Sequence, residues 1–288
     1  MSKLKLFIYL ILLIPASGIY SQETPTLYAV AIKYTPVLNT HDFEDVFGGP
    51  DRDKVKLDEQ GLIREMEFIA FPSTVFEITE RIPKDGYSIF KIVTSDYPYE
   101  SSPLYIDSRF VEVRSGRPDD RNKVMPERNE IIENILSLDG GNYMWGGNYG
   151  DGIDELLNYY RPASEIDAKE KTNWCLQGVD CSGLIYQATG GATPRNTSSL
   201  IKYGEGLNIE GKSLKEIAEM LKPLDLIVWS GHVIVALDKN TVIESSPEDG
   251  VHRSDLTERL NEVMTERTAV NDWTSTTGKR FVIRRWIE

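Results

Sequence analysis

The stretch Gly178-Val-Asp-Cys-Ser-Gly-Leu-Ile-Tyr186 organises this chain. A small turn at Gly178 leads to an acidic residue and a cysteine, and the run from Ser182 to Ala188 that follows is predicted to be helical. Cys181 would then lie at the amino end of a helix, where unpaired N–H groups and the helix dipole favour a thiolate. Because the thiolate is the attacking form of cysteine, Cys181 is a candidate nucleophile.

A histidine lies further along the chain in a second informative stretch, Ser230-Gly-His-Val-Ile-Val-Ala-Leu237. His232 stands at the head of an apolar run that predicts a buried strand. A thiol at a helix start and an imidazole on a facing strand form the arrangement that cysteine hydrolases need. A buried, inert cysteine is the alternative interpretation, and the histidine strand favours the catalytic one.

Four short strings occur in an order that resembles the NlpC/P60 family of papain-like cell-wall cysteine peptidases. They are Tyr143-Met-Trp-Gly-Gly147, Asp180-Cys-Ser-Gly183, Pro194-Arg-Asn-Thr197 and Gly231-His-Val-Ile-Val235. Pro223-Leu-Asp-Leu226 stands where the family usually has Pro-Gly-Asp-Leu. The resemblance covers roughly residues 125–285, and several motifs in order are more specific than any one alone.

The resemblance implies an α+β fold in which the helix bearing the cysteine packs on an antiparallel sheet. We expect this peptidase domain to span residues 125–288, preceded by a small all-β domain over residues 25–115. Short β-rich runs broken by turns occupy that first part, and Lys84-Asp-Gly86 predicts a hairpin. The run Tyr105 to Val113 looks like the closing segment of a bacterial SH3-like barrel, a module that commonly precedes NlpC-type domains.

Three features of this organisation stay open at the level of sequence. The first domain either positions wall glycan or peptide near the site, or packs there without a ligand. About thirty residues, 148–177, replace a connection that is short in the family, and long insertions are usually functional lids or surface elaborations. Arg195 has a planar fork suited to a substrate carboxylate, but such an arginine more often braces local structure.

The resemblance also implies roles for individual residues. Cys181 attacks, His232 serves as the general base, and Glu244 orients the imidazole from a strand where the family usually has His, Asn or Gln. Tyr143 and the Cys181 backbone N–H would hold the oxyanion. The remaining candidates for contact with the substrate or the oxyanion are Asp180 and Ser182. His252 is expected to be a surface residue.

Composition sets bounds on function. The 288-residue chain carries a net charge of -13 at pH 7, which argues against nucleic acid or an anionic membrane surface as a partner. Its three histidines and two cysteines show no zinc-ligand spacing, so we expect no metal and no cofactor. We expect a monomer.

The first residues predict export. Lys3 and Lys5 precede the apolar run Leu6 to Pro15, which is shorter than the ~20 residues that a spanning helix needs and is followed by small residues. We therefore expect a signal peptide over residues 1–21, no stable membrane insertion after its removal, and a periplasmic or extracellular protein. No cysteine near the cleavage site predicts a lipid anchor.

The two cysteines allow competing interpretations. An even count in an exported protein suggests a disulfide, which here would join Cys175 to the proposed nucleophile Cys181. Packing of Cys175 as a small hydrophobe is the alternative that we favour.

These features together predict an exported cysteine peptidase whose substrates are peptidoglycan stem peptides, and the resemblance implies cleavage between γ-D-glutamyl and a diamino acid. Family members with an SH3-like module often require a free N-terminal L-alanine, and an acid before the cysteine helps to bind its amine. The alternatives are a non-catalytic wall-binding protein and an amidase or acyltransferase of the same fold acting on another substrate.

Overall fold

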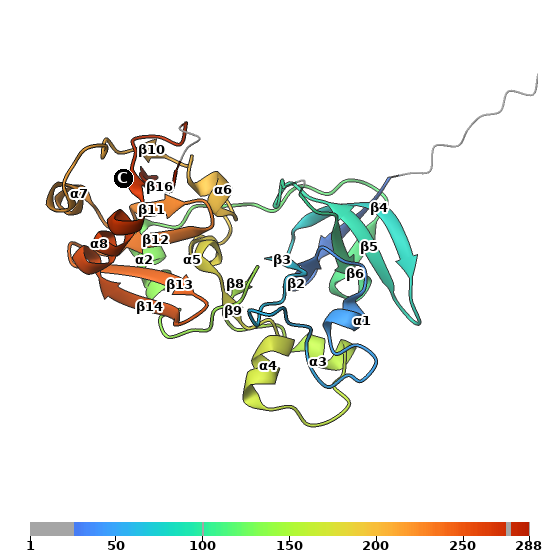
Figure 1. The fold of residues 1–288 in the computed structure, drawn as a ribbon. Coiled ribbons are helices and arrows are strands. Elements are labelled where there is room, and N and C mark those ends of the chain that lie inside the picture. The colour runs from blue at the N-terminus through green and yellow to red at the C-terminus, as the bar shows by residue number, and fades with distance from the viewer. Residues whose placement is uncertain (1–25, 100, 275–277, 288) are drawn as a thin grey trace, which may run out of the picture.

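The computed structural model describes residues 26–99, 101–274 and 278–287, and the expected signal peptide lies outside these ranges. The described chain forms two lobes that lie side by side, with helices α3 and α4 beside the first lobe (Figure 1). Within those ranges, no helix has both the length and the apolar character that crossing a bilayer requires.

The first lobe is built on an antiparallel sheet in the order β3-β2-β6-β5-β4-β1-β7. Its elements are β1 (Leu27–Ala31), β2 (Thr35–Leu38), α1 (Phe43–Val46), β3 (Met66–Ala70), β4 (Val75–Pro83), β5 (Ser88–Val93), β6 (Leu104–Asp107), the 3-10 helix η1 (Ser108–Phe110) and β7 (Val111–Arg114). Pro83 pairs with Ser88 across the turn, so the predicted hairpin is confirmed. The run Tyr105 to Val113 is interrupted by η1, and its likeness to an SH3-like barrel stays a prediction.

The second lobe contains a largely antiparallel sheet in the order β10-β16-β11-β12-β13-β14, to which β15 adds a parallel pairing with β16. Its strands are β10 (Glu205–Gly206), β11 (Leu226–Trp229), β12 (His232–Ala236), β13 (Thr241–Ser246), β14 (Gly250–Asp255), β15 (Thr268–Ala269) and β16 (Arg280–Arg285). Its helices are α2 (Arg128–Leu136), α5 (Cys181–Ala188), α6 (Thr197–Leu200), α7 (Leu214–Met220) and α8 (Leu256–Glu266).

Alternation along β12 explains how this sheet is covered on both faces. Val233 and Val235 share a core with Leu184 of α5, whereas Ile234 shares a core with Leu260 of α8. Successive side chains of a strand point to opposite faces, so a wholly apolar strand must be buried on both. The prediction that the cysteine helix packs on an antiparallel sheet is confirmed.

Helix α2 buries only one of its faces. Ile131 and Ile135 are fully buried, but Leu136 is 40% exposed. Helical positions 131 and 135 lie one turn apart on the same face, while the next residue is rotated by about 100° away from it. Leu136 therefore points away from the buried face.

The inserted residues leave and return through a short antiparallel pair, β8 (Asn148–Tyr149) and β9 (Gly178–Val179). Between them, α3 (Glu155–Tyr159) and α4 (Ala168–Trp174) pack into the core of the first lobe. The Tyr160 hydroxyl donates to Asp107 at 2.6 Å, and the indole of Trp174 donates to the Tyr160 carbonyl. This segment therefore belongs to the packing of the first lobe.

The connection between the lobes is held in place by charge. Asp96 of the first lobe is buried and pairs with Arg121 at 3.2 Å and with Lys123 at 2.7 Å. The Arg121 guanidinium also donates to the carbonyls of Gly190 and Gly191, directly after α5. The segment that connects the lobes, Ser115 to Lys123, is therefore bonded to both of them, close to the helix that carries Cys181.

Candidate active site

Cys181 is the first residue of α5, as its sequence context predicts. Asp180 caps this helix, and its carboxylate accepts a hydrogen bond from the Gly183 N–H at 2.6 Å. A Cβ on Gly183 would lie 1.9 Å from the Gly147 carbonyl oxygen, so only glycine permits this close packing. The contact between Gly147 and Gly183 thus fixes the position of the start of α5. Cys181 is 7% exposed there.

His232 opens β12 and faces two acidic partners. Its Nε2 lies 2.6 Å from Oε2 of Glu244. The Cys181 sulfur contacts the carbonyl of the preceding residue, Gly231, at 3.9 Å, and Cys181 lies close enough to the ring to raise its pKa. Since Nε2 is engaged by the carboxylate, Nδ1 is the ring nitrogen left for the sulfur. Burial by itself would lower the pKa of His232, but the interactions with Cys181 and Glu244 outweigh it and raise the pKa to about 9.

Glu244 lies on β13 with 1% of its surface exposed. Arg259 of α8 donates to it twice, from Nε to Oε1 at 2.6 Å and from a terminal nitrogen to Oε2 at 3.0 Å. Burial would raise the pKa of this carboxyl, yet its bonds to His232 and Arg259 lower it to about 2. Glu244 is therefore ionised at neutral pH and shares one oxygen between the imidazole and the guanidinium.

Cys181 opens into a cleft of about 420 Å³ between the two lobes. The second lobe contributes Tyr143, Trp145, Gly146, Asp180, Cys181, Ser182, Asn196, Thr197, Ser198, Ser230 and Gly231. The first lobe contributes Arg64, Met66, Glu67, Tyr97 and Ser101. Other cavities, including a larger one on the first lobe, are not lined by Cys181. No residue of the insertion 148–177 lines this cleft, which favours a surface elaboration over a lid.

The other predicted site residues gather around Cys181. Tyr143 lines the cleft, and burial together with the negative charges of Asp180 and Cys181 raises the pKa of its phenol. The hydroxyl therefore keeps its proton at neutral pH and can donate a hydrogen bond. Ser182 lines the same cleft, but its hydroxyl donates to Asp180 at 3.0 Å and accepts from Arg195 at 2.9 Å.

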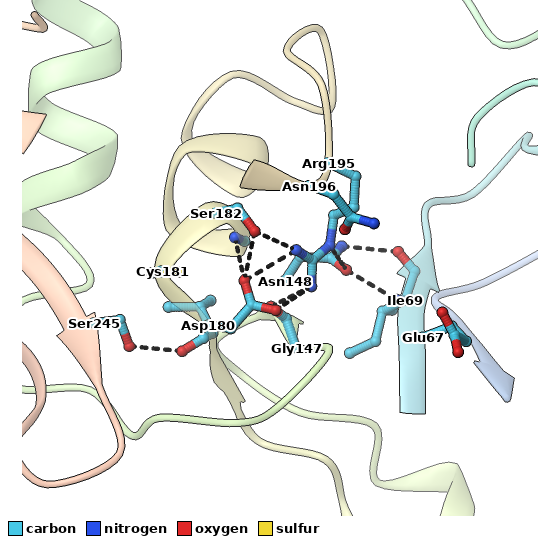
Figure 2. A network of polar contacts seen from close by, with 12 residues as sticks. Glu67, Ile69, Gly147, Asn148, Asp180, Cys181, Ser182, Arg195, Asn196 and Ser245 are labelled. Atoms are coloured by element: carbon cyan, nitrogen blue, oxygen red, sulfur yellow. Dashed lines mark hydrogen bonds and ion pairs between the residues drawn. The ribbon is translucent and has the colours of Figure 1, made fainter. Parts of the chain in front are cut away.

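Arg195 is the centre of a buried polar network behind the cleft (Figure 2). Its Nε donates to Asn148, one terminal nitrogen donates to Asp180 and Ser182, and the other donates to Asp180 and the Gly147 carbonyl. All five N–H groups of the guanidinium are thus engaged. The structure favours the bracing interpretation of Arg195, because no donor remains for a substrate carboxylate.

The same network joins the lobes. The Asn148 side chain accepts from the Ile69 N–H and donates to the Ile69 carbonyl, both at 2.8 Å, as a neighbouring strand would (Figure 2). Ile69 belongs to β3 of the first lobe, and Asn148 is fully buried. A short chain of bonds therefore runs from β3 through Asn148 and Arg195 to the cap of the helix that carries Cys181.

Sequence reasoning missed the contribution of the first lobe. Glu67 lines the cleft and accepts hydrogen bonds from Tyr97 at 2.8 Å and from Asn39 at 3.0 Å. Within the ranges that the structure describes, no lysine or arginine forms an ion pair with it. Asp180, by contrast, is bound on both oxygens by Arg195. Glu67 is thus the carboxylate in the cleft wall whose charge is available to a cationic ligand.

Two further residues were missed or misplaced. Arg259 carries no sequence signal of a site role: it lies four residues after Asp255, the cap of α8. His252 lies directly opposite Glu244 in the β13–β14 ladder and is partly exposed, so it reaches the surface but stands nearer to the site than the sequence suggested. Its Nδ1 contacts the Gly250 carbonyl at 3.1 Å.

Both cysteine thiols are free, and Cys175 lies away from Cys181 in the insertion. Its sulfur contacts Asp154 at 3.5 Å, and burial with that contact raises the pKa of the thiol to about 12. Cys175 is therefore an un-ionised, buried thiol, as expected for a residue that packs as a small hydrophobe.

Comparison with known proteins finds resemblance in structure only. No protein-family model matches the sequence, and no curated protein matches it. Solved structures that match include a NlpC/P60 family protein from Bacillus cereus, with 14% identity and a TM-score of 0.34 over 92% of this chain and 64% of the other. A P60 domain of an antigen from M. avium paratuberculosis matches 55% of this chain and 92% of its own, with 19% identity and a TM-score of 0.31.

NlpC1 from Trichomonas vaginalis matches 96% of this chain and 98% of its own length, with 12% identity and a TM-score of 0.34. The structural neighbours are thus NlpC/P60 family proteins, while the chain spans less than two thirds of the Bacillus cereus protein. At these identities and scores we draw no functional conclusion from them, and the site residues of the chain itself carry the proposal below.

Proposed function

We propose that this protein is an exported cysteine peptidase that hydrolyses an amide bond in peptidoglycan stem peptides, between γ-D-glutamyl and a diamino acid. The observation that carries the proposal is that Cys181, which lines an open cleft, lies beside the His232–Glu244 pair: its sulfur contacts the Gly231 carbonyl at 3.9 Å, and His232 bonds Glu244 at 2.6 Å. The resemblance of the motifs around both residues to the NlpC/P60 family gives the class of substrate. The first 21 residues would be the signal for export, and residues 25–115 would be an SH3-like domain.

The geometry supports a two-step mechanism. His232 takes the thiol proton on Nδ1, and the Cys181 thiolate attacks the carbonyl carbon of the substrate. The Cys181 N–H, in the first turn of α5, and the Tyr143 hydroxyl stand ready to stabilise the oxyanion. The imidazolium then protonates the leaving amine, and the ring next deprotonates the water that releases the acyl group. Glu244 holds the ring at Nε2 through both steps.

Charge in the cleft supports a substrate with a free amino terminus. Glu67 offers a carboxylate without a cationic partner among the described residues, and the Tyr97 hydroxyl fixes its orientation. An ammonium group is the complement of such a carboxylate. The wall formed by the first lobe would then select stem peptides already released from glycan, which expose the amine of L-alanine.

Digestion of defined muropeptides, with fragments identified by mass, tests the proposal. We expect release of a dipeptide from free stem peptides, and no release by Cys181→Ala although that variant folds. Cys175→Ala is the matched control, because it removes the other thiol and leaves the cleft unchanged. Turnover retained in Cys181→Ala would remove the mechanism.

The same experiment separates the proposal from a non-catalytic wall-binding protein. A peptidase labels at Cys181 with a thiol-reactive inhibitor at neutral pH and cleaves the peptide. A binding protein retains muropeptides intact in both the original chain and Cys181→Ala.

A further inference from the structure

Four ionisable side chains lie in a row across the second lobe. Cys181 contacts the Gly231 carbonyl next to His232 at 3.9 Å, His232 bonds Glu244 at 2.6 Å, and Glu244 bonds Arg259 at 2.6 and 3.0 Å. They come from four different elements, α5, β12, β13 and α8. In the ionised form of the row, the charges alternate as thiolate, imidazolium, carboxylate and guanidinium.

We propose that Arg259 is a positioning residue that neutralises Glu244, so that the two together stand in for a neutral third residue beside the Cys181–His232 pair. The inference rests on the proposed chemistry of that pair. It explains why a carboxylate is tolerated where proteins that this sequence resembles usually carry His, Asn or Gln.

Burial makes the neutralisation necessary. The Glu244 side chain is 2% exposed and that of Arg259 is 25% exposed, so the carboxylate has almost no water around it. An ionised carboxylate buried without a partner is strongly unfavourable. Both Glu244 oxygens accept from Arg259, in the two-pronged geometry that a guanidinium makes with a carboxylate. The helix α8 therefore supplies the charge that β13 requires.

Counting charge shows what each partner does. Transfer of a proton from the Cys181 sulfur to Nδ1 of His232 creates one negative and one positive charge. With Glu244 and Arg259 both ionised, the row sums to zero before and after the transfer. Without Arg259, the negative charge of Glu244 is not neutralised. This charge favours the protonated ring of His232 and opposes a second negative charge on the sulfur, so Cys181 keeps its proton to a higher pH. Without the Glu244 carboxylate, the unpaired guanidinium repels the imidazolium.

The other charged groups in the cleft with Cys181 are the same in every variant compared below. Arg64 pairs with Asp58 at 2.5 Å, and the Glu67 carboxylate, which accepts from Tyr97, adds one negative charge to all of them alike. Asp180, at the helix cap, is paired on both oxygens with Arg195 and contributes no net charge. Tyr143, which lines the cleft, keeps its proton because the pKa of its phenol is raised.

The groups around His232 are also accounted for. Glu262 accepts from Arg259 at 2.9 Å at the exposed end of the pair. Arg267 lies 4.4 Å from the Trp229 ring, and that ring lies 5.1 Å from the ring of His232. His252 stands opposite Glu244 on β14, with Nδ1 directed to a backbone carbonyl. None of these groups contacts both His232 and Glu244 as a hydrogen-bond partner.

Two substrate-free measurements on the full chain test the proposal. The first is the pH dependence of Cys181 alkylation by iodoacetamide, located by peptide mass so that Cys175 is not counted. The second is the titration of the His232 ring by NMR, with His232→Gln used to assign its signal. The variants are Arg259→Gln, Glu244→Gln, the double variant, and Arg259→Lys as the charge-conserving control.

The two single variants are expected to shift the measured pH values in opposite directions. Arg259→Gln raises the pH at which alkylation begins by about one unit, which is a tenfold slower reaction at the original onset. Glu244→Gln lowers the pH at which the imidazolium loses its proton by about the same amount. The double variant returns both values to within about half a unit of the original chain, and Arg259→Lys keeps the original onset of alkylation.

A purely structural role for Arg259 gives a different pattern. Single variants that shift in the same direction, or a double variant displaced as far as the worse single one, overturn the proposal. Loss of the original onset in Arg259→Lys does so as well. If Arg259→Gln does not fold, as judged by its melting curve, Glu244→Gln against the double variant decides. Failure to cleave muropeptides would sink the proposed function and leave these two measurements valid.

Discussion

Two arginine–carboxylate pairs flank Cys181, and they differ in what else the carboxylate holds. Both oxygens of Asp180 accept hydrogen bonds from Arg195, and one of them also accepts from the Ser182 hydroxyl and the Gly183 N–H. Glu244 gives both oxygens to Arg259 and shares one of them with the titratable ring of His232. The same chemical pair therefore stabilises the start of a helix on one side of Cys181, and on the other side it contacts the titratable ring of His232.

Loss of each arginine is the most severe way to test this contrast. Arg195→Met leaves Asp180, the largely buried cap of α5, without its cation, and we expect a loss of about 3–5 kcal/mol in the free energy of unfolding. Arg259→Met is the matched variant, and it should cost less because Arg259 is partly exposed and water can reach its place. Urea unfolding of both variants measures the difference. Equal losses would mean that the two pairs are not distinct.

The pH dependence of stability tests the titratable side. The pKa of His232 is about 9 in the folded chain against an ordinary value of 6.5, so its stabilising contribution is complete below pH 6.5 and disappears as the pH rises through 9. The contribution amounts to at most about 3 kcal/mol. We expect the stability advantage of the original chain over His232→Gln to shrink between pH 6 and pH 9.5 in denaturant unfolding. An advantage that is constant over this range would contradict the raised pKa.

A third carboxylate, Glu67, extends the comparison because it has no arginine. Its charge is available to the substrate, so Glu67→Gln should raise KM about tenfold for stem peptides with a free amine, equivalent to roughly 1.4 kcal/mol. Stem peptides acetylated at that amine supply the control, since their KM should not respond to the substitution. Steady-state kinetics on the two substrates measures both. An equal effect on each would show that Glu67 acts on the shape of the cleft.

The smallest expected effect concerns the backbone just before β11, whose neighbour β12 carries His232. Leu224 precedes β11 with a φ of 72°, in the left-handed region that favours glycine, and its side chain is fully buried. Leu224→Gly relieves this strain and Leu224→Ala does not, so we expect the glycine variant to be more stable than the alanine variant by about 1 kcal/mol. Thermal unfolding of the pair compares them. A more stable alanine variant would show that the strain is negligible.

The sequence was sufficient where short motifs contain the information. Cys181 and its cap form one string, and the apolar run that follows His232 correctly predicts a buried strand. Glu67 could not be found in this way, since it reaches the cleft only through the packing of one lobe on the other, from a strand with no unusual pattern. Arg259 is equally silent, because one arginine on an exposed-looking helix is typical of a solvated face.

The insertion was recognised by its length, but its position was not predictable for a similar reason. Trp174 and Tyr160 carry no local signal of the surface that they cover, which belongs to residues far earlier in the chain, such as Phe47 and Asp107. The resemblance supplied no relative with such a segment, and the polar residues around it are equally consistent with an exposed loop. Only the assembled lobe identifies its partner.

The side chain of Asn148 and the packing of Trp174 have a practical consequence for anyone dividing this protein. A fragment that begins near residue 125 would retain the segment 148–177 and lose the surface that covers it. Trp174 would then be exposed to water, and Asn148 would lose its two hydrogen bonds to the Ile69 backbone. The boundary suggested by the motifs is therefore a poor place to cut. The two lobes are better expressed, exchanged and engineered together.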